Sequence, residues 1–127
     1  MTAVLDASAV LAFLQGEAGA DLVEAALEAG AVIGAANWSE VAQKVRSRGA
    51  DWDLARALLD GYGIVVEPVS RADGDRAAAR WHTGNGLSLG DRLCLALGDR
   101  LNVDVLTADR AWGGSGRIRQ IRASRID

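Results

Sequence analysis

Residues 88–109 read SLGDRLCLALGDRLNVDVLTAD, and this stretch decides the fold class. After Ser88, a residue favoured at helix starts, leucines recur at helical spacing through 89–101. Residues 103–106 then form a short, mostly apolar run that is typical of a strand, and 107–109 (Thr-Ala-Asp) follow it. The stretch therefore predicts a helix that leads directly into a strand.

The same alternation continues outward through the chain. Short apolar runs predict strands at 2–5, 31–34 and 64–66, and a fifth at 118–121 on the edge of the sheet. Segments with helical spacing lie between them, at 9–14, 21–29, 38–48, 54–62 and, interrupted by Gly74, 72–82. Strands without polar alternation that are separated by helices indicate a mostly parallel sheet covered on both faces. Because the 127 residues contain no repeat and no linker, we expect one doubly wound α/β domain over 1–127.

Acidic residues stand at or beside the ends of the predicted strands. Asp6 follows the first strand, Asp109 follows the fourth, and Glu40 lies in the first turn of the helix predicted after the second. Asp91 lies in the first turn of the helix that leads into the fourth strand. Ligands of such sheets bind outside the carboxyl ends of the strands. The topology can therefore bring four carboxylates that are distant in sequence to one edge.

Each of these acids also has a purely structural explanation. Ser88-x-x-Asp91 and Asn37-x-x-Glu40 match the capping-box pattern, and Asp6 and Asp109 are suited to cap helices. Carboxylates gathered in a low dielectric, however, repel one another by roughly several kcal/mol unless protons or cations neutralise them. Hard divalent cations with oxygen ligands do this well, and Mg²⁺ is usually held by a few carboxylates and waters. The four acids together indicate a phosphodiesterase with a Mg²⁺ or Mn²⁺ site.

Composition excludes several other classes of protein. One cysteine, Cys94, and one histidine, His82, exclude an internal disulfide and a histidine-rich metal centre. No apolar run approaches the roughly 20 residues that span a bilayer, and the first six residues do not resemble a signal peptide. We therefore expect a cytoplasmic protein that does not enter a membrane. The net charge of −3 argues against a protein that coats nucleic acid.

Four stretches of the chain resemble a known family. They read VLDASAV at 4–10, NWSEV at 37–41, LSLGDRLCLAL at 87–97 and VLTADRAW at 105–112. In this order and at this spacing the chain resembles the PIN domains, specifically the VapC-type toxin ribonucleases of bacterial type II toxin–antitoxin pairs. The resemblance covers essentially the whole chain.

This resemblance implies a three-layer α/β/α fold around a mostly parallel sheet of four to five strands. It also implies cleavage of single-stranded or looped RNA by an acidic quartet, whose members here are Asp6, Glu40, Asp91 and Asp109. The quartet would hold Mg²⁺ or Mn²⁺, which lowers the pKa of a bound water so that it hydrolyses the phosphodiester bond. The expected products carry 3′-hydroxyl and 5′-phosphate ends.

Further residues and partners follow from the same resemblance. Ser8 and Thr107 match hydroxyl positions that often support the metal site, with helix or turn capping as the alternative. Arg110, Arg117 and Arg119 belong to an arginine-rich, acid-free segment at 110–125, which either guides the RNA backbone or is simply solvated. The family implies a homodimer and a cognate VapB-like antitoxin, whose tail would enter the acidic groove with an Arg or Lys competing with the metal.

Some alternatives remain open at the level of sequence. The same fold would serve an RNA-maturation or decay nuclease without an antitoxin, or a non-catalytic PIN-like interaction module. A phospho-receiver domain is disfavoured, because it needs a second acid near Asp6 and a lysine after the last strand. Cys94 and Trp38 are predicted to be core residues, whereas Trp52 and Trp81 are candidates for contact with RNA bases or a protein partner. His82 lies outside the motifs, so a general-base role is not its expected one.

Overall fold

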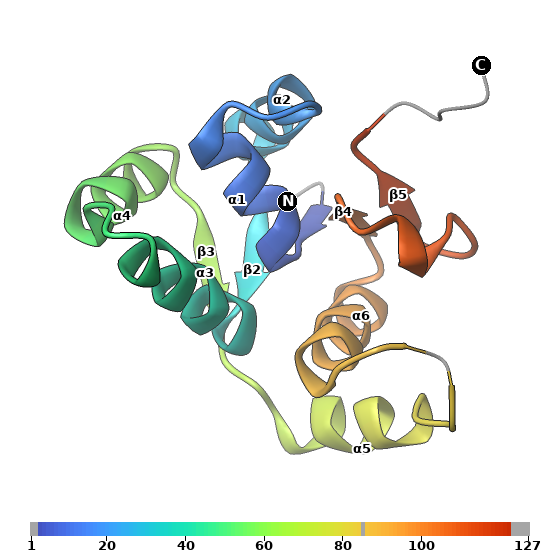
Figure 1. Ribbon diagram of the computed structural model, residues 1–127. Coiled ribbons are helices and arrows are strands. Elements are labelled where there is room, and N and C mark those ends of the chain that lie inside the picture. Colours follow the sequence, from blue (N-terminus) through green and yellow to red (C-terminus); the bar gives the residue numbers. More distant parts are fainter. Residues whose placement is uncertain (1–2, 85, 123–127) are drawn as a thin grey trace.

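A computed structural model describes residues 3–84 and 86–122, which form a five-stranded sheet with helices on both faces (Figure 1). In chain order the elements are β1 Ala3–Leu5, α1 Ala7–Gln15, α2 Ala20–Ala29, β2 Val32–Gly34, α3 Ala35–Ser47, α4 Trp52–Gly61, β3 Val65–Glu67, α5 Arg71–Ala79, α6 Leu89–Leu101, β4 Asp104–Thr107, the 3₁₀ turn η1 Arg110–Trp112, and β5 Ile118–Gln120. The predicted alternation of strands and helices is confirmed, including the edge strand near 118–121.

The order of the strands places a switch point beside β1. All pairs are parallel, and the order across the sheet is β3-β2-β1-β4-β5. The chain moves from β1 outward through β2 to β3, and then returns to the other side of β1 to form β4 and β5. The direction therefore reverses between β1 and β4, where Val4 pairs with Val105 and Leu5 with Leu106. A crevice outside the strand ends is expected at such a point.

Two apolar layers cover the two faces of the sheet. Side chains alternate along each strand, so Val4, Val32 and Val105 face α6, while Leu5 and Ile33 face the layer that α1 to α4 form. Helix α5 packs on the outside of α6, as Figure 1 shows. No described helix has the length and apolar character required to cross a membrane. The result is the three-layer arrangement expected from the sequence.

Three expectations about the elements were wrong in detail. Helix α3 begins at Ala35, directly after β2, and not near 38, so Glu40 lies in its second turn rather than its first. Because Gly34 is the N-cap, Asn37 and Glu40 do not form a capping box. Helix α5 is continuous through Gly74, since the capping box of Ser70 and Asp73 starts it firmly. Strand β3 lies at the edge of the sheet and is largely exposed.

Substitutions at two glycines, one packed against the sheet and one in open space, test the packing of α6 on the sheet. A Cβ added to Gly98 would lie 2.4 Å from Cγ2 of Val105, whereas a Cβ on Gly74 would meet nothing within 4 Å. Gly98→Ala should therefore lower the free energy of unfolding by about 1–3 kcal/mol, as overpacking does. Gly74→Ala should raise it by roughly 0.5–1 kcal/mol, because alanine favours a helix. Urea unfolding of both variants measures this, and equal effects would contradict the packing described.

Candidate active site

Asp6 occupies the switch point of the sheet. It follows β1, caps α1 by accepting the N–H of Ala9 at 2.8 Å, and donates its own N–H to the carbonyl of Leu106 at 3.1 Å. Asp6 is only 4% exposed. The sequence prediction that Asp6 caps a helix is therefore confirmed, but capping engages only part of its carboxylate.

Two hydroxyl groups hold the rest of that carboxylate. Ser8 Oγ donates to Asp6 at 2.8 and 2.9 Å from its two oxygens, and Thr107 Oγ1 donates to Oδ2 at 2.6 Å. Each hydroxyl in turn accepts a backbone N–H that follows β4, Ser8 from Ala108 at 2.9 Å and Thr107 from Asp109 at 3.0 Å. Since a hydroxyl has one hydrogen, these backbone donors turn both hydrogens toward Asp6. The network joins the start of α1 to the end of β4 and fixes the carboxylate in one orientation.

The carboxylate of Asp6 nevertheless retains negative charge that its surroundings do not neutralise. Burial raises its pKa from 3.8 to about 6, although the hydrogen bonds from Thr107, Ala9 and Ser8 lower it, and the charge of Asp91 raises it further. Three hydrogens serve a group with about four lone-pair sites, so one acceptor position remains for a ligand.

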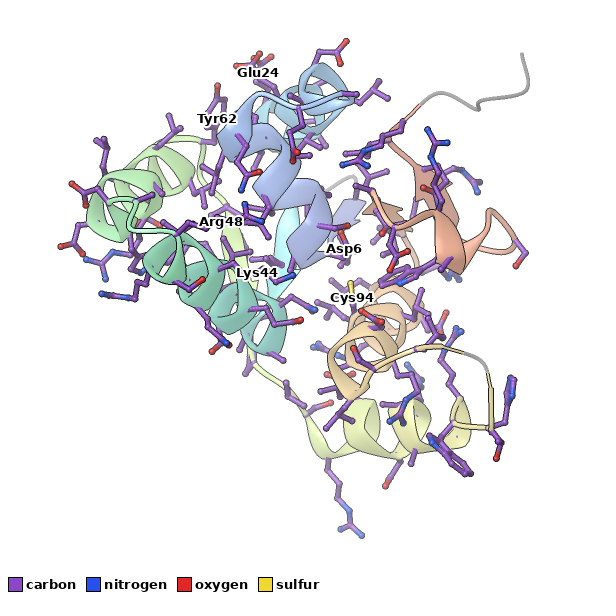
Figure 2. The ribbon with its side chains drawn as sticks, viewed as in Figure 1. Asp6, Glu24, Lys44, Arg48, Tyr62 and Cys94 are labelled. Atoms are coloured by element: carbon purple, nitrogen blue, oxygen red, sulfur yellow. The ribbon has the colours of Figure 1, made fainter. Side chains whose placement is uncertain are left out.

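The charges of Asp6, Glu40 and Asp91 all act on the thiol of Cys94. Burial raises the pKa of Cys94 well above its usual value, and the charges of Asp6, Asp91 and Glu40 raise it further. Figure 2 shows the side chains of Asp6 and Cys94 between α1 and α6. Glu40 reaches this place from α3, and Asp91 from the first turn of α6, where its Oδ2 accepts the N–H of Ser88. Cys94 itself is a fully buried core residue, as predicted.

Asp109 has a looser connection to these residues. Its Oδ1 caps η1 by accepting the N–H of Ala111 at 2.9 Å, and its own N–H donates to Thr107. Asp109 is exposed, and its charge is not among those that raise the pKa of Cys94 or Asp6. It therefore borders the site through Thr107 rather than through its carboxylate.

Several acids elsewhere in the described residues form ion pairs with arginines. Asp73 lies 2.9 Å from Arg100, Asp99 lies 2.9 Å from Arg80, and Asp104 lies 3.4 Å from Arg119. Within residues 3–84 and 86–122, none of the four predicted site acids has such a basic partner: Asp6, Glu40, Asp91 and Asp109. Several exposed acids elsewhere in the described residues also have no ion pair, but Asp6 is buried at the switch point, so its charge is shielded from water as well.

These residues fit a hard cation by their chemistry. Carboxylate and hydroxyl oxygens are the ligands that Mg²⁺ and Mn²⁺ prefer. In the part of the chain that the structure describes, no three Asp, Glu, His or Cys side chains converge closely enough to make a complete ligand set. The predicted tight crowding of all four acids into one pocket is therefore not seen.

A comparison with known families decides the assignment. The family model of the PIN domain matches residues 3–113. The chain belongs to the PIN-domain family. The VapC ribonuclease Mb2780c of Mycobacterium bovis and ribonuclease VapC42 of Mycobacterium tuberculosis are each 37% identical to it over 100 residues, 76% of this chain and 76% of theirs. These relatives place this PIN domain among the VapC ribonucleases, as the sequence motifs suggested.

Solved structures share the fold of this PIN domain. A toxin–antitoxin complex from Klebsiella pneumoniae matches 94% of the chain, and 98% of its own, with a TM-score of 0.75 and 18% identity. VapC20 of Mycobacterium tuberculosis, described as a toxin that cleaves the sarcin–ricin loop, matches 93% and 99% with a TM-score of 0.68 and 15% identity. Because the sequence identities are this low, these two matches support the fold alone.

The arginines that were predicted to contact RNA are partly engaged within the PIN domain. Arg117 lies 3.4 Å from Asp99, and Arg119 lies 3.4 Å from Asp104, beside a polar hollow of about 610 Å³ next to β5. Arg110 is exposed in η1, directly after Asp109. Of the three, only Arg110 is adjacent in sequence to a predicted site acid.

The remaining candidates lie apart from the acids. Trp52 is buried and packs edge-to-face on Trp38, with ring centroids 5.1 Å apart, so the expectation that it contacts RNA or a partner was wrong. Trp81 is 60% exposed, and His82 is exposed beside it. The sequence pattern paired Asn37 with Glu40, but as a capping box. The side-chain amide of Asn37 bonds to Glu40, because Asn37 lies within α3 and not before it.

Removing one hydroxyl tests the network around Asp6. Thr107→Val keeps the shape of the side chain, but it removes the donor to Asp6 and the acceptor of the Asp109 N–H. We expect the free energy of unfolding to fall by about 1–3 kcal/mol, because a buried polar group loses its partner. We also expect RNA cleavage to fall roughly 10–100-fold, as for other residues that orient metal ligands. Chemical unfolding and a cleavage assay measure the two effects, and a variant with unchanged cleavage would show that the network is only structural.

Proposed function

We propose that this chain is a Mg²⁺- or Mn²⁺-dependent endoribonuclease that acts as the toxin of a toxin–antitoxin pair. The observation that supports it best is Asp6. This carboxylate is buried at the switch point without a basic partner among the described residues, and a second unpaired acid, Asp91, raises its pKa further. Asp6 also caps α1, but burying its charge without a ligand lowers stability at neutral pH.

Each residue of the site has a proposed role in this reaction. Asp6, Glu40 and Asp91 would hold the ion, and Asp109 would contribute at the rim or through water. When bound, a divalent cation supplies an activated water and offsets charge on the scissile phosphate. Ser8 and Thr107 keep Asp6 ionised and oriented by donating to it. Arg110, Arg117 and Arg119 are proposed to contact the RNA backbone, since arginine binds phosphate in a forked geometry.

A cleavage assay tests this function. The purified chain is incubated with structured RNAs in Mn²⁺, in Mg²⁺ and in EDTA, and the ends of the fragments are mapped. We expect cleavage only with the metal, at a small number of loop sites, with 3′-hydroxyl and 5′-phosphate ends. Intact RNA under all three conditions would overturn the proposal.

A protein inhibitor is the second part of the proposal. An apolar hollow of about 700 Å³ lies between the ends of α1, α3 and α4, and its lining includes Leu14, Val45, Leu54 and Leu58. Leu54 is 69% exposed and Leu58 is 47% exposed. Leucines that a lone domain leaves in water are typical of a groove that accepts the apolar face of a partner helix. We propose that an antitoxin helix binds here, and that its tail extends to the acidic site and supplies an Arg or Lys.

This binding mode makes a separate prediction. Replacing both Leu54 and Leu58 by Asp should weaken the complex with the cognate antitoxin by at least about 100-fold, because two apolar anchors are lost. RNA cleavage by the free chain should stay within twofold of wild type, since neither residue is near Asp6. Titration of cleavage with antitoxin measures both quantities. Unchanged inhibition would place the antitoxin elsewhere.

We further propose that the chain forms a homodimer. Val65 and Val66 of the edge strand β3 and the nearby Val69 are 47%, 38% and 46% exposed. An exposed edge strand with apolar side chains favours association. Light scattering after size exclusion tests this, and a monomer at all concentrations would contradict it.

A further inference from the structure

Asn37 is a buried polar residue in the wall of the site. It lies in the first turn of α3 and is 1% exposed. Its Nδ2 group donates to Oε1 of Glu40 at 2.9 Å and to the carbonyl of Gly90 at 3.2 Å. Gly90 directly precedes Asp91 in the first turn of α6. One amide group therefore joins the carboxylate of Glu40 to the backbone beside Asp91.

Gly90 is what allows Glu40 to come so close. A Cβ on Gly90 would lie 2.7 Å from Oε1 of Glu40 and 3.2 Å from its Cδ. Any other residue at 90 would displace the carboxylate, which sits at the end of a flexible side chain and can move without disturbing the backbone. A side chain at position 90 would therefore disturb only Glu40 and not the packing of α3 on α6.

The orientation of the Asn37 amide is determined by its partners. Both contacts of Nδ2 are acceptors, a carboxylate and a carbonyl, so a flipped amide would place Oδ1 against two oxygens. In the observed orientation Oδ1 is buried without a hydrogen-bond partner among the described residues. A buried unsatisfied oxygen is unfavourable for folding. Fold stability therefore does not explain why an asparagine occupies position 37. Its donation to Glu40 does.

We propose that Asn37 is a positioning residue that holds the Glu40 carboxylate beside Asp91, so that both face the same cation. This inference rests on the proposed nuclease function and extends it to a residue outside the acidic quartet. Asn37 acts only through Glu40, and Gly90 provides the space that this arrangement requires.

Two variants test this role from opposite sides of the contact. Asn37→Ala removes the donor, and Gly90→Ala pushes Glu40 aside while leaving Asn37 intact. Calorimetric titration of Mn²⁺ should show affinity about 10–100-fold weaker for both, the usual effect of losing an outer-sphere partner. The kcat for RNA cleavage should fall by a similar factor at limiting Mn²⁺ and recover at high Mn²⁺, while the KM for RNA stays within about threefold. Gly90→Ala should unfold at a temperature no lower than wild type, because alanine is the better helix former.

Control variants separate positioning from general damage. Ser39→Ala changes an exposed residue between Asn37 and Glu40 and should leave Mn²⁺ affinity within twofold. In a Glu40→Gln background, Asn37→Ala should cause no further loss of affinity, since its effect passes through Glu40. If Asn37→Ala does not fold, Gly90→Ala decides the question alone.

The failures can be told apart. A wild-type chain that binds Mn²⁺ and cleaves RNA, with Asn37→Ala and Gly90→Ala variants that do so within twofold, overturns the positioning role only. Losses that add fully to that of Glu40→Gln overturn it as well. A wild-type chain that neither binds Mn²⁺ nor cleaves RNA overturns the proposed function, and the positioning role falls with it.

Discussion

Asp6→Asn is expected to abolish RNA cleavage and, at the same time, to make the chain more stable. The loss of cleavage should be about 1000-fold or more, because the substitution removes the charge of the most buried proposed metal ligand. The gain in stability follows from the pKa of Asp6, which folding raises from 3.8 to about 6. A shift of this size corresponds to about 3 kcal/mol at neutral pH as an upper limit. The amide group that the substitution introduces cannot accept one of the two hydroxyl hydrogens, which offsets about 1 kcal/mol, so we expect a net gain of roughly 1–2 kcal/mol.

The dependence of this gain on pH has a definite sign. Because the folded chain holds a proton on Asp6 more tightly than the unfolded chain does, protonation stabilises the fold at low pH. That stabilisation is complete below about pH 3.8 and is lost as the pH rises through about 6. The stability difference between Asp6→Asn and wild type should therefore be small near pH 4 and reach a plateau above pH 7. Urea unfolding in EDTA across this range measures it, and a difference independent of pH would contradict the assignment of the shift.

Asp91→Asn is the second variant with a large expected effect. Its cleavage should fall about 100-fold or more, because the lost charge belongs to the group of acids around Cys94. Its stability should change by less than about 1 kcal/mol, since an asparagine oxygen can still accept the Ser88 N–H at the start of α6. Steady-state kinetics and thermal unfolding of the variant measure both effects.

Ser88→Ala is the matched control for Asp91. It removes the other half of the same capping box, the hydroxyl that accepts the Asp91 N–H at 3.1 Å. We expect it to lower stability by about 1 kcal/mol and to leave cleavage within about threefold. If Ser88→Ala were as inactive as Asp91→Asn, the acid would serve only to start its helix. Asp109→Asn should be milder than Asp91→Asn, about 10-fold, because its carboxylate lies farther from the others.

Much of the fold and part of the site followed from simple rules applied to the sequence. Parallel strands share one edge for their carboxyl ends, so the sequence placed Asp6 and Asp109 at the same edge, and the structure shows that β1 and β4 are neighbours there. The same rule brought Ser8 and Thr107 to that edge, where the structure shows them bonded to Asp6. Hydrophobic spacing was sufficient to place these residues at one edge of the sheet, because that placement depends only on where each strand ends.

What the sequence could not provide depends on close contacts between elements. The start of α3 was misplaced, because Gly34 and Ala35 carry no side-chain cap and only the docking of α3 against β2 and α6 defines that boundary. The bond of Asn37 to Gly90 connects residues 53 positions apart, and the approach of Glu40 to the same place depends on the missing Cβ of Gly90. Neither local propensity nor spacing contains that information.

Calorimetric titration of Mn²⁺ into wild type and Asp6→Asn, in parallel at pH 7.5, examines the shared metal site without relying on any choice of RNA. Wild type should bind the ion and gain thermal stability from it, because the ion binds the folded chain. Asp6→Asn should show at least a 100-fold weaker affinity and little thermal stabilisation by Mn²⁺. Equal binding by the two proteins, or no binding by wild type, would contradict the proposal that these acids hold a catalytic metal.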